Sequence, residues 1–254
     1  MSEFDNPFGL ISSADALFLG GGTAQFYRAT GVSLGYEALG ERVRYSVTGF
    51  SERQRGVALE TDYFLFDRFI DDTVDAVLAA DDVNVAGVRG AVGWFRGIDP
   101  NGLILTGRLA GEVGGGDRSY RRVMGAASLS HPLPLGLAGA IELGAGSTWG
   151  DVTLQREFFL GGSPSLRGFG TNHAHGTAFW RARGELATGL AAARIGVFSD
   201  VGWVGPRDDV RFDDPLLSVG IGTSLLDGLF RFDVARAVRG ATGWKFHLYL
   251  DGLF

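Results

Sequence analysis

The sequence has no cysteine and no run of about 18 apolar residues. Without cysteine, disulfide bonds and thiolate metal sites are excluded. Without a long apolar run, a transmembrane helix is excluded as well. Positive charge is also scarce, because 23 Lys and Arg oppose 29 Asp and Glu, for a formal net charge of -6. Nucleic acid is therefore not expected as a partner.

Glycine and phenylalanine are abundant, at 41 and 19 residues, which is typical of strands and tight turns. Apolar and polar residues alternate in many segments, as in Val43-Arg-Tyr-Ser-Val47. The predicted strands cover residues 23–38, 41–53, 55–67, 84–97, 102–113, 119–131, 136–149, 177–187, 192–204, 216–226, 229–238 and 244–254. The pattern therefore predicts an all-β fold, a transmembrane antiparallel up-and-down β-barrel of about 12 strands.

The two faces of the later predicted strands differ in polarity. In 177–187, the charged residues Arg181, Arg183 and Glu185 share one face, and Trp180 and Leu186 share the other. A soluble β-barrel binding module would turn the apolar face inward. The charged face is rich in glycine and arginine, which favours a wet interior with lipid outside. The lipid bilayer is thus the first expected partner.

Short and long connections alternate along the predicted strands, as in outer-membrane barrels with short periplasmic turns. Residues 54–55 and 227–228 are short connections, whereas 67–83 and 205–215 are long and rich in aspartate. The connection at 39–40 breaks the alternation because it is short on the predicted outer side. An even number of strands places both chain ends in the periplasm.

Residues 150–176 show no alternation and form the longest predicted connection. The glycines of the Gly161-Gly162 and Arg167-Gly168 pairs permit sharp turns or close backbone approach. Phe158, Phe159, Leu160, Leu166 and Phe169 have the character of packing anchors, which a disordered loop does not need. We expect a hairpin that folds back onto the protein and presents Arg167 to a buried acid.

Two motifs in this part of the chain resemble a known family. Gly161-Gly162-Ser-Pro-Ser-Leu166-Arg167-Gly168-Phe169 is similar to the Leu/Val-Arg-Gly-Phe/Tyr signature of the BamA/TamA and FhaC-type outer-membrane barrel superfamily, the bacterial surface antigen barrels. Phe198-Ser-Asp200-Val-Gly202 matches that superfamily's second motif, Phe-x-Asp-x-Gly. The chain also ends on Phe254, as outer-membrane barrels usually do.

The resemblance implies that the loop enters the barrel lumen and that Arg167 pairs with Asp200 of the wall. The expected site is the loop motif Gly161, Gly162, Leu166, Arg167, Gly168 and Phe169, the wall motif Phe198, Asp200 and Gly202, and a surrounding network of Arg181, Arg183 and Glu185. Phe246, Leu248, Leu250 and Phe254 resemble the terminal signal that barrel-assembly machinery recognises during biogenesis. These four residues are equally explained as lipid-facing side chains.

Enzymatic and metal-binding functions find little support in the sequence. Ser163 and Ser165 lie close to His173 and His175, but the Gly-x-Ser-x-Gly nucleophile elbow is absent. Two histidines at i and i+2 without a fixed third ligand are usually ordinary loop residues. We therefore expect no catalytic residues, no metal and no cofactor.

Residues 1–22 are predicted to form a periplasmic lead-in to a barrel at 23–254, with 150–176 as the lumen-entering loop. The first residues lack the basic and apolar regions of a signal peptide. The resembled superfamily usually carries periplasmic POTRA domains before about sixteen strands. Either the barrel is small and POTRA-less, or the sequence is a fragment; we expect a closed barrel, because open edges in lipid are prohibitive.

The expected function is an outer-membrane barrel related to protein-insertion and secretion pores, located in the bacterial outer membrane. Its lumen is plugged by the Arg-Gly-Phe loop, and its role lies in outer-membrane protein assembly or polypeptide transport. Unfolded polypeptide, a separate POTRA protein and a second copy of the chain are the candidate partners. The alternatives are a small-solute pore or structural barrel that has lost transport, and a soluble binding module.

Overall fold

The computed structural model describes residues 27–56, 79–97, 102–188, 193–225 and 230–249. Eleven strands form one antiparallel sheet in chain order, and two short strands pair separately. The sheet contains β1 (Tyr27–Leu39), β2 (Val43–Gly56), β3 (Val83–Arg96), β4 (Ile104–Gly116), β5 (Tyr120–Leu133), β6 (Leu137–Gly150), β9 (Ala178–Thr188), β10 (Ala193–Gly205), β11 (Leu216–Leu225), β12 (Phe230–Arg239) and β13 (Trp244–Tyr249). The predicted all-β, antiparallel up-and-down architecture is confirmed.

One predicted strand, 55–67, is wrong as a member of this sheet. β2 pairs directly with β3, with Val43 opposite Trp94 and Gln54 opposite Val83, so no strand lies between them. Residues 55 and 56 complete β2, and 57–67 lie outside the described residues. The prediction failed because period-2 alternation does not reveal which strands pair with each other, and the β2–β3 pairing leaves no place for a strand between them.

Without that strand, the longest connections, 57–82, 151–177 and 206–215, all lie at one end of the sheet. Residues 40–42, 97–103, 134–136, 189–192 and 226–229 join strands at one end, and 57–82, 117–119, 151–177, 206–215 and 240–243 join them at the other. The short connection at 40–42 is thus no exception, since it lies with the other short turns. β1 consequently begins at the end with the long connections, contrary to the predicted entry from the periplasmic side.

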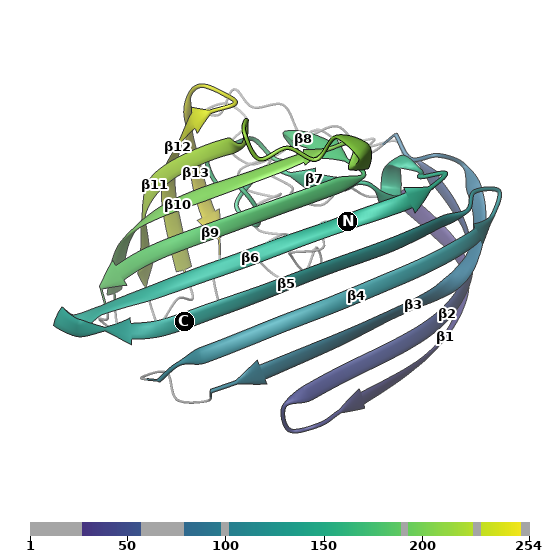
Figure 1. Ribbon diagram of the computed structural model, residues 1–254, viewed down its shortest axis with the longest axis horizontal. Helices are drawn as coiled ribbons and strands as arrows, with labels where there is room; N and C mark the ends of the chain where they lie inside the picture. The colour runs from purple at the N-terminus through teal and green to yellow at the C-terminus, as the bar shows by residue number, and fades with distance from the viewer. Residues whose placement is uncertain (1–26, 57–78, 98–101, 189–192, 226–229, 250–254) are drawn as a thin grey trace.

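The sheet is curved, and both of its edges bend toward the same side (Figure 1). β1 and β13 are the edge strands, and no pairing joins them within the described ranges. The expected closed ring is therefore not formed by these strands. Twist between neighbouring strands produces the curvature, whereas closure would require the two edges to reach hydrogen-bonding distance.

The sheet has two faces of opposite character, here called inner and outer. The segment 151–177 packs on the inner face, where Asp200 and Asp233 are fully buried. The outer face exposes apolar side chains, including Val197 at 56% and Phe246 at 65%. A soluble barrel would bury these residues in its centre, so the arrangement opposes that alternative and agrees with lipid outside.

The segment 151–177 is a hairpin that folds back over the inner face. A 3-10 turn, η2 (Leu154–Arg156), precedes β7 (Phe158–Leu160), which pairs with β8 (Ala174–Gly176). Four of the five predicted anchors pack into one core with residues of the sheet: Phe158, Leu160, Leu166 and Phe169 join Met124, Phe179 and Ala237, whereas Phe159 is half-buried outside this core. Burial of these apolar side chains stabilises the packing of the hairpin on the inner face of the sheet, and this packing places the hairpin's arginines next to the strands.

Candidate functional site

Arg167 and Asp200 make a bidentate ion pair between the hairpin and β10. The guanidinium donates from Nε to Oδ2 at 2.9 Å and from Nη2 to Oδ1 at 2.6 Å. The backbone N–H of Arg167 donates to the same Oδ2 at 2.9 Å. Side-chain exposure is 2% for Arg167 and 0% for Asp200. The geometry fixes both the position and the orientation of the hairpin tip.

Three more strands contribute to the surroundings of Arg167. Its Nη1 donates to Glu185 of β9 at 3.1 Å and to Asp233 of β12 at 3.5 Å. Arg231 also binds both of these carboxylates, with its Nη2 2.5 Å from Glu185 and its Nε 2.9 Å from Asp233. On β13, a ring nitrogen of His247 lies 2.6 Å from the Arg167 carbonyl oxygen. The hairpin tip is thus bound to β9, β10, β12 and β13.

Arg181 and Arg183 of β9 extend the network along the hairpin. Both form ion pairs with Glu142 of β6, and both donate to the carbonyl oxygen of Pro164. These ion pairs join four guanidinium groups, Arg167, Arg181, Arg183 and Arg231, to four carboxylates, Asp200, Asp233, Glu142 and Glu185. These formal charges balance, which buried ions require.

Phe198 and Gly202 of the wall motif serve the same contact. The guanidinium carbon of Arg167 lies 3.5 Å from the centroid of the Phe198 ring, a cation–π contact. A Cβ on Gly202 would stand 3.3 Å from Leu160 of the hairpin and 2.9 Å from the carbonyl oxygen of Trp180. The motif therefore supplies a ring, a carboxylate and free space at alternate inner positions of β10.

The glycines of the hairpin motif have separate roles. Gly161 and Gly162 have φ values of 128° and 85°, which side chains rarely adopt, and they allow the turn. Gly168 instead allows close approach, because a Cβ there would stand 2.3 Å from the Cβ of Ser218 on β11. Leu166 and Phe169 are fully or almost fully buried on either side of this contact.

A second buried arginine, Arg156, was missed by the sequence reasoning. Its Nε donates to Glu112 at 2.8 Å, its Nη1 to the Tyr27 hydroxyl at 2.9 Å and its Nη2 to Glu52 at 3.3 Å. Burial lowers the pKa of Arg156, but Tyr27 and Glu112 outweigh this effect and hold the pKa above its ordinary value. The available signal was two glutamates, each spaced to face inward in a predicted strand, with an arginine close to the anchor Phe158.

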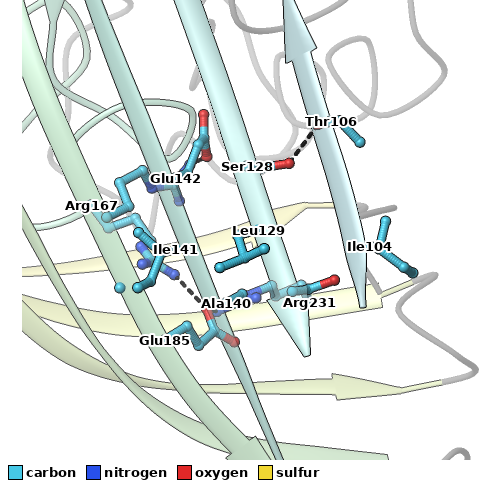
Figure 2. Close-up of a pocket in the computed structure, with 13 residues that line it drawn as sticks. Ile104, Thr106, Ser128, Leu129, Ala140, Ile141, Glu142, Arg167, Glu185 and Arg231 are labelled. Atoms are coloured by element: carbon cyan, nitrogen blue, oxygen red, sulfur yellow. Dashed lines mark hydrogen bonds and ion pairs between the residues drawn. The ribbon is translucent and has the colours of Figure 1, made fainter. Parts of the chain in front are cut away.

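A cavity of about 210 Å³ lies beside the Arg167 network. Figure 2 shows Thr106 and Ser128, whose hydroxyl oxygens lie 2.6 Å apart, on one wall, and the ion pair of Arg167 with Glu185 on another. Arg183, Glu142 and Arg231 line it as well. It is smaller than the roughly 300–1,000 Å³ of typical small-molecule pockets, and its ions already pair with one another.

The histidines and serine considered for catalysis or metal binding lie within the hairpin segment and contact other residues of it. His175 lies 2.5 Å from Glu157, His173 packs against Phe169, and the Ser165 hydroxyl bonds the backbone of Gly161. The described residues hold no cluster of three or more His, Cys, Asp or Glu side chains suited to a metal ion. Of the terminal signal, Phe246 and Leu248 are exposed on the outer face, while Leu250 and Phe254 lie outside the described residues.

Solved structures with the same fold are CdiB from Acinetobacter baumannii and BamA from Haemophilus ducreyi lacking POTRA domains 1-3. CdiB is 18% identical with a TM-score of 0.58, covering 88% of this chain and 42% of its own. BamA is 17% identical with a TM-score of 0.62, covering 88% of this chain and 53% of its own. CdiB from Escherichia coli is 16% identical with a TM-score of 0.60, and the match covers 88% of this chain and 44% of that CdiB chain. The chain thus spans about half the length of these structures.

A comparison with curated proteins found no match. The family model of the Omp85 superfamily domain, in contrast, matches residues 96–245, more than half of the 254 residues. That match contains both the hairpin motif with Arg167 and the wall motif with Asp200. The resemblance expected from these motifs is confirmed, and the chain belongs to the Omp85 superfamily.

Proposed function

We propose that the protein is a bacterial outer-membrane protein of the insertion and transport class, and that the segment 151–177 plugs its interior. Membership of the Omp85 superfamily supports this class, since its members are transport and insertion proteins. The apolar outer face supports a bilayer environment, because Val197 and Phe246 would otherwise meet water. No enzymatic role is proposed.

The buried clamp between Arg167 and Asp200 is the observation that carries the plug proposal. A buried ion pair contributes little net stability, but removing only one of its partners is strongly destabilising, because the other charge stays buried without compensation. Such a pair is therefore suited to holding a segment in one place. Together with the contacts to Glu185, Asp233 and His247, it holds the hairpin tip against four strands of the inner face.

Two measurements on reconstituted protein test the proposal. In planar bilayers, intact protein should conduct weakly, and Arg167→Ala should conduct more, because the plug is no longer fastened. In liposomes, intact protein should accelerate insertion of a small client barrel kept unfolded in urea. Arg211→Ala is the control for both, since the Arg211–Asp209 pair is exposed, at 57% and 55%, and lies in the 206–215 connection outside the hairpin segment.

High steady conductance without client insertion would contradict the transport class and favour the small-solute pore. Equal conductance of the intact protein and Arg167→Ala would contradict the plug.

We further propose that unfolded polypeptide and a separate POTRA protein are its working partners. Barrel-assembly machinery would recognise Phe246 and Leu248 during biogenesis, and mass measurement in detergent would reveal a homodimer.

A further inference from the structure

The hairpin segment has two buried arginines that bind opposite halves of the sheet. Arg156 contacts Tyr27 of β1, Glu52 of β2, and Glu112 and Tyr120 of β4 and β5. Arg167, eleven positions further along, contacts β9, β10, β12 and β13. One short segment thereby reaches from the first edge strand of the described sheet to the last.

The Arg156 contact has the chemistry of an anchor. Its side chain is 7% exposed, and its partners Glu52 and Glu112 are each 14% exposed. Five donors in a planar fork let one guanidinium bind two carboxylates and a hydroxyl at once. Without Arg156, the largely buried carboxylates of Glu52 and Glu112 would lose this cation.

Residues around Arg156 fix the backbone of the same turn. Gln155 donates from Nε2 to Gln54 of β2 at 2.8 Å, and the backbone N–H of Asp81 donates to its Oε1 at 3.2 Å. Thr148 of β6 donates from its hydroxyl to the carbonyl oxygen of Arg156 at 3.2 Å. The anchor is therefore held by side-chain and main-chain contacts, which limits its movement relative to β2 and β6.

Among the described residues, strand pairing joins the two halves of the sheet only between β6 and β9. A curved sheet whose halves are joined by one strand pair can bend along that pair, here β6 and β9. A segment fastened to both halves crosses the chord of the curve and opposes such bending.

We propose that Arg156 is a positioning residue that makes the hairpin segment a strut. With Arg167 at its other end, the strut holds the edge strands β1 and β13 at one separation. Loss of either anchor releases the edges, although the pairing within each half persists. The inference concerns the separation of two strands, so it stands or falls apart from the transport role.

Distance measurement between spin labels tests the strut. The sequence has no cysteine, so labels attach only where cysteine is introduced. Leu34→Cys on β1 and Phe246→Cys on β13 place labels on exposed outer positions, 85% and 65% exposed. We expect one narrow distance distribution in the otherwise intact protein, and a broader or shifted one in Arg156→Gln. Arg211→Gln is the matched control, because its ion pair with Asp209 lies outside the segment 151–177, and it should leave the distribution unchanged.

Three further arms separate a strut from a general loss of structure. A reference pair within one half, Leu34→Cys with Val47→Cys on the adjacent strands β1 and β2, should keep its distance in Arg156→Gln. Arg167→Gln should broaden the β1–β13 distribution to a similar extent. The double variant should broaden it no further, because a strut with one free end is already released. Arg156→Lys should give an intermediate width, since a point charge keeps fewer contacts.

Three results would overturn the proposal. An unchanged β1–β13 distribution in Arg156→Gln would mean that the edges are held by other contacts. A change in the reference pair would mean that Arg156 supports local folding of β1 and β2. Broadening in the double variant equal to the sum of both single effects would mean that the two arginines act independently.

Discussion

Arg167 satisfies both carboxylate oxygens of Asp200 through three hydrogen bonds, one of them from its own backbone N–H. Asp200 therefore fixes the position of the hairpin backbone at residue 167 as well as that of the Arg167 side chain. A lysine at 167 could supply the charge and the N–H, but not the two parallel guanidinium bonds. The contact is specific for arginine at this place in the chain.

Replacing Arg167 by alanine should lower the free energy of unfolding by about 3–5 kcal/mol, because Asp200 would stay buried without a cation. The measurement is urea unfolding in detergent micelles, followed by tryptophan fluorescence. Arg211→Ala, which breaks an exposed pair in the 206–215 connection, should cost far less. Equal losses in the two variants would show that the clamp contributes no more than a surface ion pair.

A methyl group at Gly168 should displace the hairpin tip from β11. Its Cβ would stand 2.3 Å from the Cβ of Ser218 and 2.9 Å from the backbone nitrogen of Ala237. Overpacking of this kind costs about 1–3 kcal/mol. Gly184→Ala is the control, since a Cβ there meets nothing within 4 Å. The two variants are compared by thermal unfolding, and an equally stable Gly168→Ala would mean that the hairpin is free to shift.

An arginine on the outer face should be costly in a bilayer and harmless in a connection. Val197→Arg replaces a 56% exposed residue within β10, where we expect a loss of about 2–4 kcal/mol if the site is near the bilayer midplane. Val210→Arg, in the 206–215 connection at 47% exposure, should change little. Folding into lipid vesicles, followed by mobility on unheated gels, measures both. Unimpaired folding of Val197→Arg would argue against lipid at this face.

Glu185 should behave as a shared partner of two arginines. It accepts from Arg167 at 3.1 Å and from Arg231 at 2.5 Å, so Glu185→Gln removes one of four balancing negative charges. We expect the Glu185→Gln and Arg167→Ala losses in unfolding free energy to fall short of additivity by about 0.5–3 kcal/mol in the double variant. Glu37→Gln, whose exposed carboxylate lies 3.9 Å from Arg44, is the additive control. Strict additivity for Glu185 would separate it from the clamp.

Local patterns in the sequence were sufficient for the type of fold and for the two faces of the later strands. Period-2 alternation identified the charged face with Arg181 and Glu185 and the apolar face with Leu186, because a strand's side chains alternate whatever its neighbours are. The same rule failed at 55–67, since polarity does not reveal whether a segment has a pairing partner. The register of β2 on β3 decided that strand and, with it, the side on which each connection lies.

By itself, the sequence indicated a hairpin with packing anchors at 158–170, and the resemblance of its two motifs to a known superfamily implied that Arg167 pairs with Asp200. Only the tertiary structure decided that Arg156 is a second anchor, with partners 104 and 44 positions away in the chain. Ion pairs of such long range depend on how strands are brought together in space. Side-chain spacing along one strand cannot specify that arrangement. Arg167 was predicted because two recognised motifs contain it and Asp200, whereas no such motif contains Arg156 and its partners.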